Sequence, residues 1–155
     1  MYGNDIYKKL AAFQASSAKI AVAESCTGGM LAALLTEMPG SSKFFQAGFV
    51  TYSNDSKINV LSIDTNLLVE YGAVSEQVAI ARAINAVKIA NADIAVAITG
   101  LAGPQGETSN KKIGTVCFAG FSKSKTISKT CHFEGSRAEV RLQSVEEAMS
   151  ILAEL

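Results

Sequence analysis

The sequence predicts an α/β protein, a three-layer α/β/α sandwich built on a mixed, mostly parallel sheet of about five strands. Segments with helical spacing alternate along the chain with short apolar runs, an order typical of this class. Residues 113–134 form two strands around a turn too short for a crossover helix, so they add an antiparallel pairing. The 155 residues are 48% hydrophobic and 18% charged, and we expect one domain over residues 1–155.

The first half of the chain contains three helical and two strand-like segments. A helix over 4–16 places Ile6, Leu10 and Phe13 on one face, and the apolar run 19–23 predicts a buried strand. Helical sequence returns from about Gly28 to Glu37 and stops at the sequence MPGSS. Residues 44–53 are aromatic and β-branched, which predicts a strand, and 54–62 predict a short helix capped by Asn54 or Asp55.

The second half continues the alternation. Thr65 to Tyr71 predict a short helix with Gly72 at its C-terminal cap, and Ser75 caps a longer helix that ends at about Ala90. Residues 93–100 predict another buried strand, followed by the polar loop 101–112 and then the two strands of 113–134. Ser136 and Glu139 have capping-box spacing and open the final helix.

Composition excludes several classes of protein. Lys+Arg and Asp+Glu are both 14, so nothing indicates a nucleic-acid-binding face, and the basic group Lys123, Lys125 and Lys129 is interpreted as a solvated strand or hairpin face. Three cysteines without tight spacing argue against a disulfide framework and a zinc site. No apolar run is long enough for a membrane span, and the amphipathic N-terminus does not resemble a secretory signal, so we expect a cytoplasmic protein that does not bind membranes.

Residues that can act in catalysis or binding lie at three predicted strand ends. They are the segments 24–29, 51–57 and 99–104. In open α/β sheets, ligands bind at the carboxyl ends of the strands. We therefore expect these segments to form one site.

Ser25, in the sequence AESCTGG, lies between a buried strand and a helix. The free N–H groups of the helix start can stabilise an oxyanion or hold a phosphate, and small residues at Gly28 and Gly29 let a substrate approach the backbone. An equally open interpretation is that Ser25 or Thr27 only caps the helix. Cys26 is a rival nucleophile, although a cysteine here is more often a small buried residue.

A serine nucleophile needs a base. His132 is the one histidine, and it lies in an alternating strand, where a packed or surface role is typical. Lys57 lies one helical turn past a strand end, and burial would lower its pKa into a useful range, although a surface lysine is the plainer interpretation. Tyr52 at the same strand end is a candidate to relay a proton or to bind the lysine, or is simply a half-buried strand aromatic.

Two further groups are candidates for substrate binding. Thr99, Gly100 and Gly103 suit a close-fitting backbone wall, or only a tight turn ahead of a proline. Arg137 and Arg141 lie four residues apart at the start of the last helix, where two guanidinium groups favour an anion such as a phosphate. Pairing with Glu134 or Glu139 is the alternative for both.

Six segments in order resemble the CinA C-terminal domain family, the nicotinamide-nucleotide amidohydrolases. They are AESCTGG, PGSSKFFQAGFVTYSNDSK, YGAVSEQVA, DIAVAITGLAGPQG, IGTV and GSRAEVR. The resemblance runs from about residue 5 to the C-terminus, and the chain has the length of the stand-alone form of the family. It implies an α/β/α sandwich, an enzyme without a metal or other cofactor, and assembly into homo-oligomers, either dimers or larger.

The implied reaction is the deamidation of nicotinamide mononucleotide (NMN) to nicotinic acid mononucleotide and ammonia, in pyridine-nucleotide salvage. By motif, the resemblance makes Ser25 the nucleophile and Tyr52 and Lys57 its partners. It makes the segment Thr99, Gly100, Ala102 and Gly103 the glycine-rich wall, beside the turn of Thr27, Gly28 and Gly29. Arg137 is the arginine that meets the substrate, with Arg141 as a second candidate. An inactive nucleotide-binding relative, or a hydrolase acting through Cys26, are the alternatives.

The chain departs from the family pattern at a few positions. Ser136 stands where an Asp usually precedes the arginine, and Lys112 replaces a proline in the sequence before IGTV. Arg82 and Asn85 stand where Met and Gly are common. None of these differences removes the proposed nucleophile or its partners.

Overall fold

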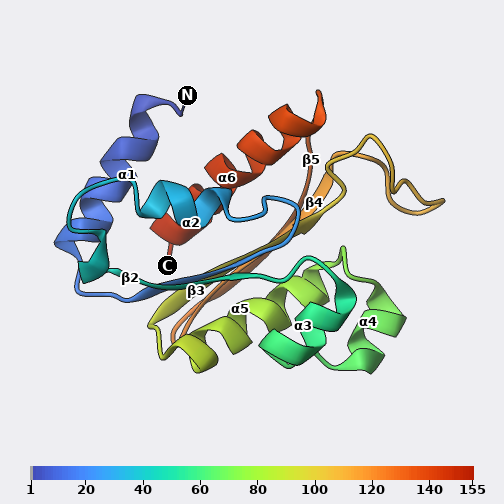
Figure 1. Ribbon diagram of the computed structural model, residues 1–155, viewed down its shortest axis with the longest axis horizontal. Coiled ribbons are helices and arrows are strands. Elements are labelled where there is room, and N and C mark those ends of the chain that lie inside the picture. The colour runs from blue at the N-terminus through green and yellow to red at the C-terminus, as the bar shows by residue number, and fades with distance from the viewer. Residues whose placement is uncertain (1) are drawn as a thin grey trace.

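A five-stranded sheet forms the centre of the molecule, and the computed structural model describes residues 2–155 (Figure 1). The strands lie in the order β2-β1-β3-β4-β5. Their bounds are β1 (Ile20–Glu24), β2 (Phe45–Val50), β3 (Ile94–Gly100), β4 (Thr115–Ser122) and β5 (Thr126–His132).

The pairing of the strands confirms a mixed, mostly parallel sheet. β1 pairs in parallel with β2 on one side and with β3 on the other. β4 is antiparallel to both β3 and β5, so it alone runs against the other four strands. The short β4–β5 turn forces this reversal, as predicted. The carboxyl ends of β1, β2 and β3 therefore meet at one edge.

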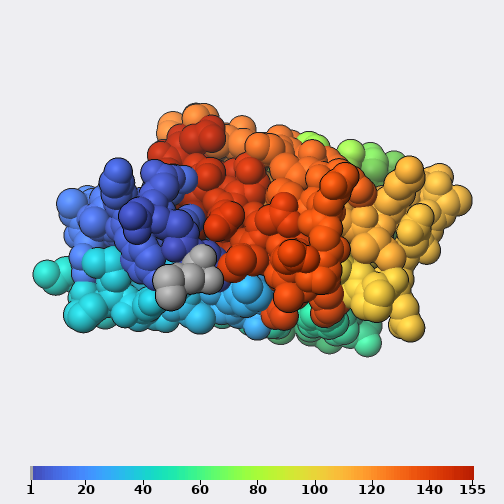
Figure 2. Space-filling model, turned by 90° about the horizontal axis from the view of Figure 1, so that it is seen from above, coloured from blue at the N-terminus to red at the C-terminus, as the bar shows by residue number. Residues whose placement is uncertain are grey.

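Helices cover both faces of the sheet, which confirms the three-layer sandwich (Figure 1). One face carries α1 (Asn4–Ala15), α2 (Met30–Leu35) and α6 (Arg137–Ala153), and Figure 2 shows α1 and α6 side by side there. The other face carries α3 (Asn54–Leu61), α4 (Thr65–Tyr71) and α5 (Glu76–Ala90). A 3₁₀ turn, η1 (Ser41–Lys43), precedes β2. Across residues 2–155, every helix is too short or too polar to traverse a lipid bilayer.

The two faces of the sheet differ in side-chain size, and the sequence sets this difference. β1 and β3 both read Ile-Ala-Val-Ala, and alternate residues of a strand point to opposite faces. The Ile and Val side chains pack toward α1, α2 and α6, whereas the alanines pack toward α5. Small residues on both sides of that contact let α5 lie close to the sheet.

Three element boundaries differ from the sequence-based expectation. α2 begins at Met30 rather than at about Gly28, because Gly28 and Gly29 have φ values of 57° and 98° and form a turn. β2 ends at Val50, three residues earlier than predicted. The cap of α3 is Ser53, whose hydroxyl accepts from the Ser56 N–H at 3.0 Å, and not Asn54 or Asp55, which are helical.

Candidate active site

The turn that carries Ser25 is built by the residue before it. The Glu24 carboxylate, fully buried at the end of β1, accepts hydrogen bonds from the N–H groups of Gly29 (3.1 Å), Leu31 (3.1 Å) and Ala32 (2.8 Å). A carboxylate satisfies the free donors and complements the dipole of a helix N-terminus. Neither Ser25 nor Thr27 caps α2, so the interpretation of these residues as simple helix caps is wrong.

Ser25 and Lys57 meet although they lie on different elements. Lys57, on α3, points its Nζ at the Ser25 Oγ, at 3.4 Å, and at the carbonyl oxygens of Thr51 and Tyr52, both at 3.0 Å. Ser25 is 8% exposed and Lys57 is 1% exposed. Three oxygens match the three donors of an ammonium group, and loss of one proton lets the serine hydroxyl donate to the amine instead.

The environment of Lys57 favours its neutral form. Burial, and after it the positive charge of Arg82, lower the pKa of Lys57 from its ordinary value to about 8. At pH 7 about a tenth of the molecules then carry a neutral amine. A lysine tuned in this way can take a proton from a nearby hydroxyl near neutral pH.

Cys26 also borders the site but is poorly suited to nucleophilic attack. Burial raises the pKa of the Cys26 thiol to about 11, although the charge of Arg82 acts in the opposite direction. A thiol is nucleophilic as the thiolate, which is scarce at neutral pH with such a pKa. The geometry and the charge therefore favour Ser25 over its neighbour.

Tyr52 and Arg137 face each other at the rim. Arg137, at the first position of α6, donates to the Tyr52 Oη at 3.1 Å and to the Gly103 carbonyl at 2.8 Å. The Tyr52 ring is exposed, and its link to Lys57 runs through the backbone carbonyl rather than through the phenol. The proton-relay role of Tyr52 therefore stays a prediction, while its hydroxyl positions the guanidinium of Arg137.

A cavity of about 230 Å³ joins these residues. It is lined at its base by Ser25, Cys26 and Lys57, and at its rim by Tyr52, Asn54, Gln105 and Arg137. Thr99, Gly100, Ala102 and Gly103, the residues predicted to form a backbone wall, also line this cavity. A Cβ on Gly100 would lie 2.7 Å from Val116 Cγ2 and 2.9 Å from the Thr115 carbonyl oxygen, so only glycine fits there. The Thr99 hydroxyl donates to the Ala73 carbonyl at 2.8 Å.

The remaining predicted residues lie behind the cavity rather than in its lining. Arg141 donates from Nε to the Cys26 carbonyl at 3.0 Å and from Nη2 to the Thr27 carbonyl at 3.1 Å, so it holds the turn from outside. Thr27, Gly28 and Gly29 belong to that turn, and they shape the backbone beside Ser25. His132 is exposed at the end of β5, away from this lining.

Sequence reasoning missed three residues that organise the site: Glu24, Thr51 and Arg82. Thr51 and Arg82 are fully buried, and Arg82 donates to the Thr51 Oγ1 at 3.0 Å. The signal available for Glu24 was its place in the sequence, directly before Ser25 and shortly before the two glycines of the turn. Nothing in local spacing indicates that α5 brings Arg82 to the end of β2.

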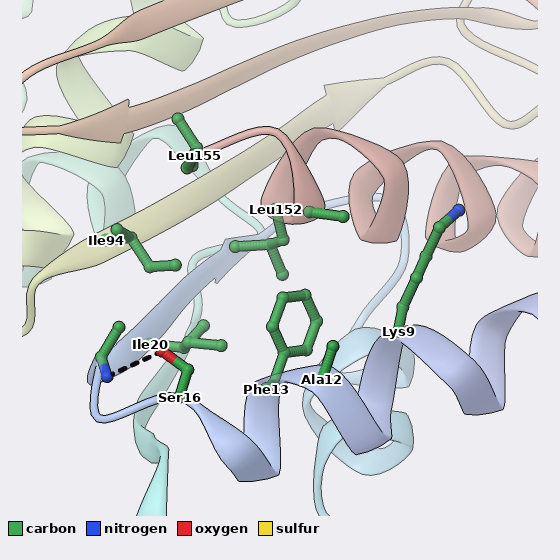
Figure 3. Close-up of a pocket in the computed structure, with 10 residues that line it drawn as sticks. Lys9, Ala12, Phe13, Ser16, Ile20, Ile94, Leu152 and Leu155 are labelled. Carbon is green, nitrogen blue, oxygen red and sulfur yellow. Dashed lines mark hydrogen bonds between the residues drawn. The ribbon is translucent and has the colours of Figure 1, made fainter.

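A second cavity, of about 320 Å³, lies at the opposite end of the sheet (Figure 3). Its lining is mostly apolar, with Phe13 and Leu152 facing each other from α1 and α6. Its two polar groups already have partners: the Lys9 Nζ pairs with Asp5 at 2.8 Å and donates to the Ser150 Oγ at 3.1 Å, and the Ser16 Oγ accepts from the Ala18 N–H at 3.1 Å. The cavity beside Ser25 is therefore the candidate active site.

Comparison with known proteins gives consistent relatives. The family model described as CinA C-terminal domain matches residues 5–155. A CinA-like protein from Mycobacterium marinum is 43% identical over 97% of this chain, and one from Mycolicibacterium gilvum is 48% identical over 86% of it. These matches span 37% and 32% of the two relatives, so the chain covers about a third of the length of the curated relatives it matches.

Solved structures show the same fold. The competence/damage inducible protein CihA from Agrobacterium tumefaciens has a TM-score of 0.94 at 36% identity, covering 99% of this chain and 97% of that one. A competence-damaged protein (CinA) superfamily protein from Escherichia coli has a TM-score of 0.92 at 35% identity, covering 100% and 94%. The fold and the sequence therefore point to the same relatives.

Proposed function

This chain belongs to the CinA C-terminal domain family, and from that premise we propose that it is a nicotinamide-nucleotide amidohydrolase. The reaction is the hydrolysis of NMN to nicotinic acid mononucleotide and ammonia. The observation that carries the proposal is the 3.4 Å approach of the buried Lys57 Nζ to the Ser25 Oγ at the base of a cavity. A nucleophile beside a base of lowered pKa is the arrangement that acyl transfer requires.

In the first half of the reaction, the Ser25 Oγ bonds to the carboxamide carbon while the neutral Lys57 amine takes the hydroxyl proton. The C–N bond then breaks, and the Lys57 ammonium gives its proton to the departing amide nitrogen, which leaves as ammonia. Ser25 now holds the acyl group as an ester. In this scheme one lysine serves both proton transfers, since it lies 3.4 Å from the Ser25 Oγ, the atom to which the reacting carbon is bonded.

In the second half, a water molecule attacks the ester carbon and passes a proton to the Lys57 amine. The bond between the acyl carbon and the Ser25 Oγ breaks, and Lys57 returns the proton to that oxygen. The product is the carboxylic acid, and the enzyme is restored. Amide plus water has become acid plus ammonia, without a net change in the protein.

The oxyanion needs N–H donors that are not already used. The Gly28 N–H donates to the Ser25 carbonyl at 3.0 Å, and the Gly29 N–H donates to Glu24. Within residues 2–155 the N–H groups of Cys26 and Thr27 donate to no backbone carbonyl, so they are the donors we assign. Arg137 at the rim is the cation we assign to the substrate phosphate, since a guanidinium suits bidentate phosphate binding.

The experiment is ammonia release from NMN at pH 8, with wild type compared with Lys57→Met. Loss of the base should lower the rate by about 10² or more. Lys88→Met, which removes an exposed lysine from α5, is the matched control and should retain the wild-type rate. Binding of NMN by the wild type without any turnover would contradict the proposal and leave a nucleotide-binding protein in its place.

A further inference from the structure

Arg82 is a buried cation without a carboxylate partner. It lies on α5 with 0% exposure, and its Nη1 donates to the Ile98 carbonyl at 2.7 Å while Nη2 donates to the Thr51 Oγ1 at 3.0 Å. Its buried Nε has no partner among the described residues, and neither of the two ion pairs they form includes it. The carboxylate oxygens of Glu24, the nearby acid, bind the N–H groups of the α2 turn.

Such a group is costly for stability. Moving a charge out of water is strongly unfavourable unless an opposite charge and hydrogen bonds compensate, and apolar residues of similar volume often replace buried ions without loss of stability. Burial lowers the pKa of Arg82 to about 10, which still leaves the guanidinium charged at neutral pH. Its presence is better explained by an effect on neighbouring groups than by packing.

Thr51 connects Arg82 to the candidate base. The Thr51 hydroxyl accepts from Arg82, while the carbonyl of the same residue accepts from the Lys57 Nζ at 3.0 Å. One turn further along α5, the Asn85 Nδ2 donates to the Leu61 carbonyl at 2.7 Å, at the end of the helix that carries Lys57. α5 therefore fixes both the strand end that binds Lys57 and the helix that bears it.

We infer that Arg82 is a positioning residue for the Ser25–Lys57 pair, because its guanidinium holds Thr51, whose carbonyl binds the Lys57 amine. Its fixed positive charge also disfavours the ammonium form of that amine. For its effect on rate, this inference rests on the proposed function. The effect on the proton affinity of Lys57 does not require a substrate.

The other charged or titratable groups around Lys57 do not supply the same effect. They come from four elements and are Glu24 and Cys26 at the end of β1, Tyr52 after β2, Asp55 on α3 and Arg137 on α6. The Cys26 thiol is neutral because its pKa is raised to about 11, and a thiolate there would act in the opposite direction. The carboxylates of Glu24 and Asp55 are negative, so they favour the ammonium form of Lys57 and act against Arg82. Asp55 lies in the exposed first turn of α3. Arg137 lies at the rim and bonds to the Tyr52 phenol.

A direct titration of Lys57 tests the inference without any catalysis. The protein is labelled with ¹³Cε-lysine, and the resonance absent from Lys57→Met is assigned to Lys57 and followed from pH 6 to 11. Arg82→Met removes the guanidinium, and Arg82→Gln removes its charge but keeps an amide donor for Thr51. In both variants the midpoint of the Lys57 titration should rise by about half a pH unit to one pH unit, because the positive charge is lost. Lys88→Met removes an exposed cation from the same helix and should leave the midpoint in place.

An unchanged midpoint in a folded Arg82 variant would overturn the inference, as would a shift of the same size in Lys88→Met. Failure of both Arg82 variants to fold would also overturn it, since the residue would then be structural. The same variants should move the acid limb of kcat/KM for NMN upward by the same amount. If the wild type releases no ammonia, the proposed function fails, but the titration still decides the role of Arg82.

Discussion

Lys57 controls the proposed chemistry through its protonation state. The neutral amine is the active form. With a pKa of about 8, the neutral fraction rises nearly tenfold for each unit by which the pH increases, until the pH reaches that pKa. We therefore expect kcat/KM for NMN to rise from pH 7 to about 8 and to level off above it, measured as the initial rate of ammonia release at low substrate concentration. A flat profile over this range, or one that falls, would show that Lys57 is not the base.

Arg137 and Arg141 have different roles although both come from the start of α6. Arg137 lines the cavity, whereas both contacts of Arg141 are to carbonyl groups of the Ser25 turn. Arg137→Gln should raise the KM for NMN by about 10-fold to 100-fold, because a hydrogen bond to a charged group contributes about 1.5–3 kcal/mol.

The control for this prediction is a substrate without a phosphate. Nicotinamide riboside should show a KM that Arg137→Gln changes little, since no charged group is lost from its complex. An equal rise in KM for both substrates would mean that Arg137 acts by holding Tyr52 and the rim of the cavity, and not by binding the phosphate.

At the scale of the elements, Glu24 joins β1 to α2. Its carboxylate receives three N–H groups, so Glu24→Gln loses the charge and turns an amide NH₂ toward donors. We expect this variant to lower the free energy of unfolding by about 1–2 kcal/mol, measured by denaturant titration. Glu37→Gln, an exposed change just after α2, should stay within about 0.5 kcal/mol of wild type. Equal stabilities for the two variants would contradict this role of Glu24.

Element boundaries show what local sequence can predict. The helix from Ser75 to Ala90 and the capping box of Ser136 and Glu139 were predictable, because each depends on side chains within one turn of the helix start. The start of α2 was misplaced because Gly28 and Gly29 form a turn, and the N–H groups that follow bind Glu24 on the preceding strand. The cap of α3 was assigned one residue late because Ser53, Asn54 and Asp55 are all favourable capping residues in series.

The molecule as a whole depends on the contrast between its two sheet faces. Ala23, Ala97 and Ala119 lie opposite one another on three neighbouring strands, beneath α5. Ala97→Leu would insert a large side chain into this close contact and should destabilise the protein by about 1–3 kcal/mol, measured by thermal or denaturant unfolding. Ala33→Leu, on the exposed side of α2, is the control and should change stability little. No loss in Ala97→Leu would mean that α5 is not packed closely.

The fold could be predicted from the sequence more completely than the site. Alternation of apolar runs and helical spacing decides the layers, and the motif AESCTGG marks one strand end as special. The approach of Lys57 to Ser25 joins residues 32 positions apart, and the contact of Arg82 with Thr51 joins residues 31 positions apart. Such contacts depend on strand order and helix packing, which local periodicity does not determine. The different positions of Arg137, which lines the cavity, and Arg141, which binds the Ser25 turn from behind, likewise depend on the direction of each side chain.

Ser25, and not its neighbour Cys26, is the group that we propose attacks the amide. The most direct measurement is the initial rate of ammonia release from NMN at pH 8.5 for Ser25→Ala and Cys26→Ala, with folding checked by circular dichroism. We expect the rate to fall by a factor of about 10³ or more in Ser25→Ala and to stay near wild type in Cys26→Ala. A folded Ser25→Ala variant that releases ammonia at the wild-type rate would contradict it.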